Sequence, residues 1–238
     1  MGWSLTLPNI ARMTSRGLPR YTADDLVAAS GEELVAVERR VDRAVYRARY
    51  EGGFVRYTWF HPESGGYWLA EFPDGKRSWF GATAEGVAVP AARVEGPEGV
   101  AEWRLTEQRD AVSPLNRVRY EWELNASGWA YVRAAEWAEG VSGFRYRVTF
   151  TYESRVDVIS EARYGFDLRQ DRRVRQIEVS RSGRRVKSWR LSYEEEGGLS
   201  RLVRVERFGS VGQQPFPLVF EFGYTRSFLG ARDSGGGG

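Results

Sequence analysis

Residues that could carry out catalysis are few in this sequence. Its 238 residues include a single histidine, His61, and no cysteine, so a Ser-His-Asp or Cys-His arrangement would have only one available base. His61 stands directly before Pro62 in a segment rich in turn-forming residues, and no G-x-S-x-G nucleophile motif is present. We therefore predict that His61 is a surface turn residue and that the chain is not an enzyme.

An acidic triplet, Glu194 to Glu196, supplies the carboxylates that some transferases and glycosidases use. It follows an alternating segment that ends at Tyr193 and precedes Gly197-Gly198, which is typical of a charged hairpin turn. The sequence selects no particular pair of carboxylates for glycoside chemistry, because their separation in space is not visible in it. It also lacks H-E-x-x-H, EF-hand, P-loop and G-x-G-x-x-G patterns, so we expect no metal and no cofactor.

Basic residues are only slightly in excess, with 35 Lys and Arg against 32 Asp and Glu. The densest basic run, residues 169–175, is interrupted by Asp171 and contains no aromatic residue, so we interpret it as a solvated face rather than a phosphate-binding surface. Arginine far outnumbers lysine, which fits ladders of Arg–Glu ion pairs across strands. No nucleic-acid partner is expected.

Nine tryptophans and twelve tyrosines admit two interpretations. Alternation of aromatic with charged residues favours packing on one face of a sheet. Trp3, Trp59, Trp68 and Trp79 are expected to be structural. Exposed aromatic side chains could instead hold a glycan or a protein, which remains the alternative function.

Short alternating segments separated by glycine turns predict an all-β fold of antiparallel, meandering, twisted sheets. Hydrophobic residues make up 42% of the chain and 27 residues are glycine. Residues 12–21 are expected to form an extended arm, and residues 81–99 a long loop or a poorly defined strand. Residues 23–37 could form a short helix from Asp24 or a hairpin turning at Ser30-Gly31, and the alternation in 33–37 favours the hairpin. The other expected strands and hairpins are 3–7, 41–60 turning at Gly52-Gly53, 67–72 and 76–80 joined at Asp74-Gly75, 103–105, 118–122, 128–137, 144–152, 173–179, 187–193, 202–207 and 218–224.

The opening segment, GWSLTLPNIARMTSRGLPRY at residues 2–21, resembles the start of the N-terminal domain shared by SpvB-type virulence proteins and the B components of Tc (toxin complex) insecticidal toxins, which belong to the RHS/YD-repeat group. The resemblance continues in collinear order to residue 224, through DLVAASGEELVAV, YRARYEGGFVRYTW, GYWLAEFPDGKRSWFG and SWRLSYEEEGGLSRLVRVERFG. The residues that carry the signature, and for which a structural role is implied, are Gly2, Trp3, Ser4, Leu5, Leu7, Pro8, Gly17, Leu18, Pro19, Arg20, Tyr21, Asp74 and Gly75.

This resemblance implies sheets of the RHS/Tc-toxin shell type. It implies an SpvB-like scaffold domain at residues 1–230, part of a larger protein, followed by a flexible Gly-rich tail or linker at 231–238. The implied role is non-catalytic: the sheets contribute to a shell that encloses and helps deliver a C-terminal toxic polypeptide. Implied partners are the remaining RHS/YD-repeat shell, that toxin domain and, through a β-propeller, the toxin-complex translocation channel, with no membrane insertion by this segment.

Two further expectations follow from the resemblance. The protein would be secreted as part of a bacterial toxin assembly after synthesis in the cytoplasm, although no signal peptide is visible in this sequence. SpvB proteins also carry an ADP-ribosyltransferase domain with a Glu-x-Glu pair; Glu194 and Glu196 have that spacing, but the supporting motifs are missing upstream, so this enzyme is the least favoured alternative. Sheet edges left free in the isolated chain should promote self-association.

Overall fold

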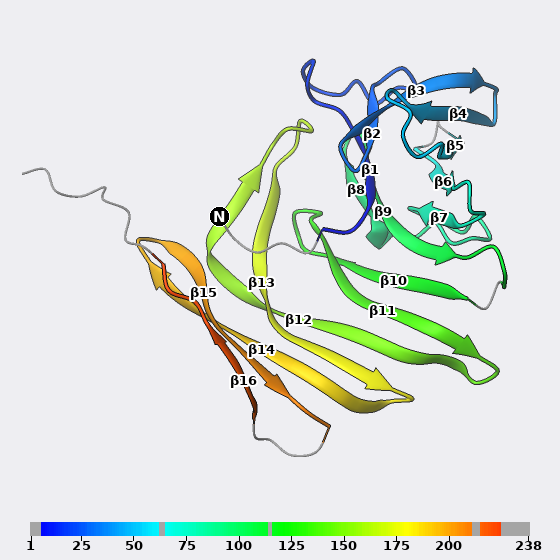
Figure 1. Ribbon diagram of the computed structural model, residues 1–238. Helices are drawn as coiled ribbons and strands as arrows, with labels where there is room; N and C mark the ends of the chain where they lie inside the picture. The colour runs from blue at the N-terminus through cyan, green and yellow to red at the C-terminus, as the bar shows by residue number, and fades with distance from the viewer. Residues whose placement is uncertain (1–5, 62–64, 114–115, 211–214, 225–238) are drawn as a thin grey trace, which may run out of the picture.

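The protein folds as one antiparallel β-sheet of sixteen strands, part of which closes on itself. The computed structural model describes residues 6–61, 65–113, 116–210 and 215–224. These residues include no α-helix, and strands follow one another across the sheet in nearly sequential order. The expected all-β, meandering, antiparallel architecture is confirmed (Figure 1).

The first half of the chain closes into a barrel. Strands β1 to β7 pair in order, β7 pairs with β9, and β9 pairs with β1, so these eight strands form a ring. Closure is made by the pairs Asn9↔Arg104, Ile10↔Trp103 and Ala11↔Glu102. The barrel strands are β1 (Asn9–Arg12), β2 (Val27–Ala29), β3 (Glu32–Arg39), β4 (Arg43–Ala48), β5 (Arg56–Phe60), β6 (Tyr67–Glu71), β7 (Arg77–Phe80) and β9 (Gly99–Arg109).

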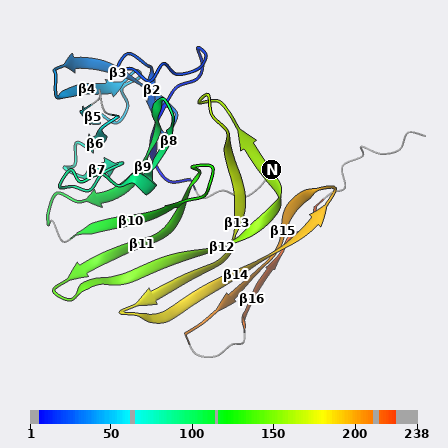
Figure 2. The same cartoon turned by 180° about the vertical axis from the view of Figure 1, so that it is seen from behind.

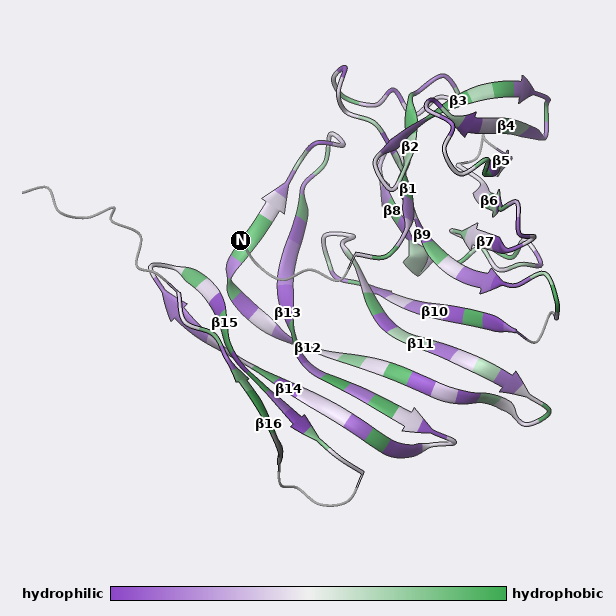
Figure 3. Cartoon of the chain, in the orientation of Figure 1, coloured by the Kyte–Doolittle hydropathy of each residue, from purple (hydrophilic) through white to green (hydrophobic). Residues whose placement is uncertain are grey.

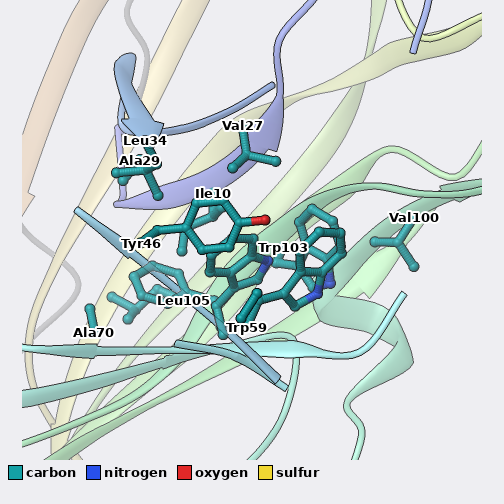
Figure 4. Close-up of a cluster of buried hydrophobic side chains, with 13 residues drawn as sticks. Ile10, Val27, Ala29, Leu34, Tyr46, Trp59, Ala70, Val100, Trp103 and Leu105 are labelled. Atoms are coloured by element: carbon teal, nitrogen blue, oxygen red, sulfur yellow. The ribbon is translucent and has the colours of Figure 1, made fainter. Parts of the chain in front are cut away.

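Side chains fill the barrel, as expected for a ring of eight strands. The registers Trp59↔Trp68, Trp68↔Phe80 and Ile10↔Trp103 put large apolar residues from neighbouring strands on the same face. Each barrel strand contributes to this core, and Trp59, Trp68 and Trp103 are 0% exposed (Figure 4). The expected structural role of Trp59, Trp68 and Trp79 is confirmed by their burial.

The second half of the chain is an open sheet of longer strands that leaves the barrel at β9. It fans away from the barrel as a single layer (Figures 1 and 2). Register shifts within β10, β12, β14 and β15 are β-bulges, which increase the local twist and bend. Its strands are β10 (Arg117–Leu124), β11 (Ala130–Gly140), β12 (Gly143–Glu161), β13 (Leu168–Arg181), β14 (Arg184–Glu196), β15 (Leu199–Phe208) and β16 (Pro215–Glu221).

Strand β9 is the element that both halves share. Along one edge it pairs first with β8 (Arg93–Gly96) and then with β7, and along the other edge first with β1 and then with β10. Seven of its eleven residues are buried. Removing β9 would therefore open the barrel and detach the open sheet at once.

The hairpin turns lie at the glycine-containing dipeptides that predict them. Ser30-Gly31 joins β2 to β3, and 49–55, with Gly52-Gly53 inside it, joins β4 to β5. The Asp74-Gly75 hairpin also forms, but its loop has three residues rather than two, because the Gly75 N–H donates to the Phe72 carbonyl and Phe72 donates to that of Lys76. Gly75 has a φ of 81°, as this turn with a bulge requires.

Two expectations about element positions are wrong. Of the two alternatives for residues 81–99, an uninterrupted long loop is wrong, because the segment contains the short strand β8 (Arg93–Gly96) after the irregular 3-10 turn Pro90–Ala92. The strand expected at 3–7 lies partly outside the described residues; Thr6 to Pro8 are not in a strand, and β1 begins directly after Pro8. Proline thus precedes the ladder instead of ending it.

Candidate functional site: a barrel–sheet junction and an uncovered sheet

Arg12, the last residue of β1, is buried at the point where the barrel meets the arm that follows it. It is 3% exposed, and its Nε donates to the Val100 carbonyl at 2.9 Å. Its Nη1 donates to the Thr22 carbonyl and to Asp25 Oδ2, both at 2.7 Å. Burial lowers the pKa of Arg12, while the Asp25 carboxylate opposes that shift. The guanidinium therefore stays charged and ties three separate segments together.

Asp25 holds the end of the extended arm against this arginine. The backbone N–H groups of Arg20 and Tyr21 donate to its carboxylate at 3.0 and 2.7 Å, in addition to the bond from Arg12. Three charge-assisted hydrogen bonds converge on one side chain. The arm, which has no regular secondary structure from Met13 to Tyr21 as expected, is thereby fixed in position.

A chain of tyrosine hydroxyls links the arm to the open sheet. Tyr21 Oη donates to the carbonyl of Tyr164 at 2.6 Å, and Tyr164 Oη donates to Glu102 Oε1 at 2.6 Å. Tyr164 lies between β12 and β13, whereas Glu102 lies on β9. Burial, reinforced by the nearby Glu102 carboxylate, raises the pKa of Tyr164 well above its ordinary value. The neutral hydroxyl can therefore remain a donor.

A second apolar core lies under the same link. Val94, Ala101, Ala130, Tyr164 and Leu168 are buried together, so strands β8, β9 and β11 pack on the β12–β13 connection. Gly96 allows this packing, because a Cβ at that position would lie 2.3 Å from the ring of Phe166. The junction is thus packed as well as hydrogen bonded.

Asn125 makes the other polar connection between separated strands of the open sheet. Its Nδ2 donates to the Arg169 carbonyl at 2.7 Å and to Asp171 Oδ1 at 2.8 Å. Its Oδ1 accepts the N–H groups of Ser127 and Trp129, which shapes the β10–β11 turn. One buried amide therefore sets the turn and anchors it to β13.

Signature residues occupy several different places in the structure. Arg20 and Tyr21 meet at Asp25, while Leu7 is half-buried and Leu18 is 66% exposed. Gly17 has a φ of 110° in the arm. Asp74 and Gly75 form a separate exposed turn beside Ala111. Pro8 is exposed and Pro19 is half-buried, whereas Gly2, Trp3, Ser4 and Leu5 lie outside the described residues.

Of the residues that build the junction, Arg20 and Tyr21 belong to the signature, whereas Arg12, Asp25, Glu102 and Tyr164 were not singled out from the sequence. Arg12 reaches a partner 88 positions away, Tyr164 one 62 positions away and Tyr21 one 143 positions away. No short motif connects positions at such separations. The Asp25 contacts with Arg20 and Tyr21 are the exception, because a carboxylate four or five residues beyond two N–H groups is a local turn signal.

Residues of the open sheet are less buried than those of the barrel strands, on both faces of the sheet. No residue of β10 or β12 is buried, and β14 contains a single buried residue, Ser188. Apolar and charged residues alternate along these strands (Figure 3), as in a sheet with one apolar and one polar face. Trp137 and Tyr146, for example, stack at 5.6 Å between ring centroids while remaining partly exposed.

Ion-pair ladders cross this open sheet, as the arginine content predicts. Arg147 on β12 contacts Glu121 on β10 and Glu136 on β11, each at 2.6 Å. The two carboxylates raise the pKa of Arg147, chiefly because its guanidinium donates hydrogen bonds to Glu121. Arg173 on β13 similarly contacts Glu153 on β12 at 2.8 Å. Neighbouring strands are therefore held together by side chains on the polar face as well as by the backbone.

The last strand leaves one edge of the sheet unpaired. β16 pairs with β15 alone among the described strands. Three of its exposed residues are apolar, with Leu218 45%, Val219 37% and Phe220 50% exposed, and the strand ends at the exposed Glu221. An edge of this kind is a template for another strand.

No catalytic arrangement is visible among the residues that the structure describes. His61 is exposed with a φ of 51°, and Glu194 to Glu196 form the exposed end of β14 before the Gly197-Gly198 turn, both as predicted. The described part of the chain contains no group of three or more His, Cys, Asp or Glu side chains that could hold a metal ion. Its helices include none long and apolar enough to cross a membrane.

Comparison with known families gives one match. The model described as "SpvB: Salmonella virulence plasmid 65kDa B protein" matches residues 1–139. That range contains the whole barrel, β10 and most of β11. A comparison with curated protein sequences finds no match.

Solved structures share the fold over most of the chain. The N-terminal domain of effector protein SpvB from Salmonella typhimurium strain LT2 aligns with a TM-score of 0.74 and 19% identity, covering 87% of this chain and 88% of that one. The TcdB2-TccC3-Cdc42 structure aligns with a TM-score of 0.74 and 21% identity, and a Photorhabdus luminescens Tc holotoxin pore with 0.74 and 20%. This chain spans only 13% of each of those two longer chains.

Proposed function

Because the chain belongs to the SpvB family, we propose that it is a non-catalytic structural domain of a large bacterial toxin-like protein. In this role it contributes β-sheet to an RHS-type shell that encloses, and helps to deliver, a C-terminal toxic polypeptide. One observation carries the proposal: a closed, packed barrel anchors a single-layer sheet whose faces are partly uncovered and whose last edge is unpaired. Such a sheet suits a wall that is completed by further chain.

The proposed partners follow from the size of the longer relatives. Chains of the TcdB2-TccC3 and Tc holotoxin structures are several times longer than this one, which matches 13% of them. We place this chain, residues 1–230, as the N-terminal scaffold of a similar assembly, with residues 231–238 as a tail or linker. Its partners would be the rest of an RHS/YD-repeat shell, the toxin domain and, through a propeller, a translocation channel, all within a secreted assembly.

The two alternative functions receive less support from the geometry. A glycan- or protein-binding module would use exposed tryptophans, but Trp59, Trp68, Trp79 and Trp103 are buried. The other described tryptophans, Trp122, Trp129, Trp137 and Trp189, are half-buried, and none is exposed. An ADP-ribosyltransferase would need Glu194 and Glu196 in a cleft, whereas both are solvent-facing at the end of β14. The signature residues, including Asp74 and Gly75, are accordingly proposed to act in folding rather than in chemistry.

Protease protection of the C-terminal polypeptide tests this proposal in the full-length protein. We expect the polypeptide to resist digestion while the shell is intact. Arg147→Glu, which breaks the ladder to Glu121 and Glu136, should make the polypeptide more sensitive, while Arg49→Glu at an exposed barrel ion pair serves as the matched charge-reversal control. A polypeptide digested equally fast in all three proteins would contradict enclosure.

A further inference from the structure

A cavity of about 370 Å³ lies at strands β13, β14 and β15 of the open sheet. Its size is at the lower end of the range of roughly 300 to 1,000 Å³ seen for small-molecule sites. It is lined by Gln176, Arg185, Ser188, Trp189, Arg190 and Phe208. Neither the barrel–sheet junction nor the proposed shell role uses these residues.

Two arginines in this cavity lack the ion-pair partners that their neighbours have. Arg173 on β13 and Arg201 and Arg204 on β15 each contact a glutamate. Arg185 and Arg190 contact no carboxylate within ion-pair distance in the part of the chain that the structure describes. The cavity therefore contains two guanidinium groups with free donors.

The nearest acidic residues by register are already engaged. Arg190 lies opposite Gln176 on β13 and Glu206 on β15. Glu206 contacts Arg204 at 3.2 Å, and Glu178 accepts a hydrogen bond from Gln176 Nε2 at 3.5 Å. Neither carboxylate forms an ion pair with Arg185 or Arg190 among the described residues, so both guanidinium groups keep free donors.

Ser188 adds a hydroxyl to the same wall. The residue as a whole is 4% exposed, but its Oγ is not fully buried, so the hydroxyl can donate a hydrogen bond to a group in the cavity.

Phe208 supplies an apolar surface and orients one of the guanidinium groups. It is 9% exposed, lies directly opposite Ser188 in the β14–β15 register, and the Arg190 guanidinium carbon is 5.2 Å from its ring centroid. Stacking on the ring restricts the side chain of Arg190 and leaves its N–H groups available at the ring edge.

From these contacts we propose that the cavity binds an oxyanion, a carboxylate or a phosphate, carried on a small apolar or aromatic body. The planar guanidinium forks of Arg185 and Arg190 match the two oxygens of such a group, and the Ser188 hydroxyl donates a further hydrogen bond. The apolar body packs against Phe208. The site is independent of the shell function proposed above.

Titration of the folded chain with benzoate, phenyl phosphate and benzyl alcohol, followed by amide chemical shifts in NMR spectra, tests the site. We expect saturable shifts at Ser188 and Phe208 with at least one of the two anions and none with the neutral alcohol. Saturation by benzoate alone identifies a carboxylate ligand, and saturation by phenyl phosphate alone a phosphate. Arg190→Gln should weaken binding at least tenfold, and Ser188→Ala several-fold.

Arg184→Gln is the matched control, because it removes the same charge from an exposed residue at the adjoining hairpin end, outside the cavity. It should change the affinity less than twofold. The proposal is wrong if neither anion gives saturable shifts at these amides, or if Arg184→Gln weakens binding as much as Arg190→Gln does.

Discussion

The barrel and the open sheet share strand β9 but are held together in different ways. In the barrel, the strands enclose a core in which Trp59, Trp68 and Trp103 are 0% exposed. In the open sheet, β12 has nineteen residues and none of them is buried. The barrel is therefore stabilised mainly by apolar burial and the sheet by backbone pairing and cross-strand ion pairs. The first half is organised around its own core, whereas the second would, under the proposed function, be covered by additional chain.

The largest expected difference between the halves is in the cost of removing a tryptophan. Trp68→Ala should lower the free energy of unfolding by about 4 kcal/mol, because it leaves a cavity between Trp59 and Trp103. Trp189→Ala, on the half-buried face of β14, should cost about 1 kcal/mol. Urea unfolding of both variants measures this, and equal losses would show that the open sheet has a core of its own.

Charge deletion gives the next comparison. Arg12→Met should cost about 3 kcal/mol, because Asp25 and the Val100 carbonyl would be left buried without their donor. Arg147→Met should cost about 1 kcal/mol, because its side chain and those of its partners are partly exposed. Thermal unfolding monitored by circular dichroism compares the two, and a larger loss from the Arg147 variant would reverse the expected ranking.

The free edge of the sheet should govern self-association of the isolated chain. Val219→Lys, on β16, should weaken association several-fold, since a charge on an edge strand opposes further pairing. Val37→Lys places the same charge on an exposed residue of β3, at the bulge in its pairing with β4 and away from the β16 edge, and should have little effect. Sedimentation at several concentrations gives the result. If the unsubstituted chain remains monomeric throughout, the edge does not act as a template.

The smallest expected effect is on how the free energy of unfolding depends on pH under acid conditions. Hydrogen bonds from Arg155, and then from Ser200, hold the pKa of Asp157 well below its usual range. The stabilisation is therefore present above the unfolded-state pKa of about 3.9 and is lost as the pH falls through the folded-state pKa. Asp157→Asn should flatten the stability profile in that acid range, and Arg155→Met should do so partly. An unchanged slope of unfolding free energy against pH would contradict this.

Local features of the fold could be predicted from the sequence, whereas closure of the barrel could not. Ser30-Gly31 and Asp74-Gly75 specify hairpins because glycine adopts the backbone angles that a turn needs within a few residues. The β1–β9 pairing joins positions more than ninety residues apart, and neither Asn9–Arg12 nor Gly99–Arg109 contains a local sign of it. Family resemblance predicted the type of fold but not this ring.

The lengths of the strands and the contacts of the junction could not be predicted from the sequence either. The strand expected over 144–152 continues to Glu161, because Arg155 and Asp157 satisfy each other's charges within it and Asp157 also accepts hydrogen bonds from Ser200. Such polar residues look like a turn when their partners on other strands are unknown. The burial of a charged residue such as Arg12 cannot be predicted from the sequence either, since its hydrogen-bond acceptors come from distant segments.

Residue-resolved hydrogen–deuterium exchange tests the central claim. That claim is that the barrel is stabilised by its own core, whereas the open sheet is stabilised fully only when further chain covers it. In the isolated protein, amides of β4, β5, β6 and β9 should exchange only through global unfolding, whereas those of β15 and β16 should exchange orders of magnitude faster through local opening. Uniform protection across both halves would contradict the account, because it would show that the open sheet is already complete.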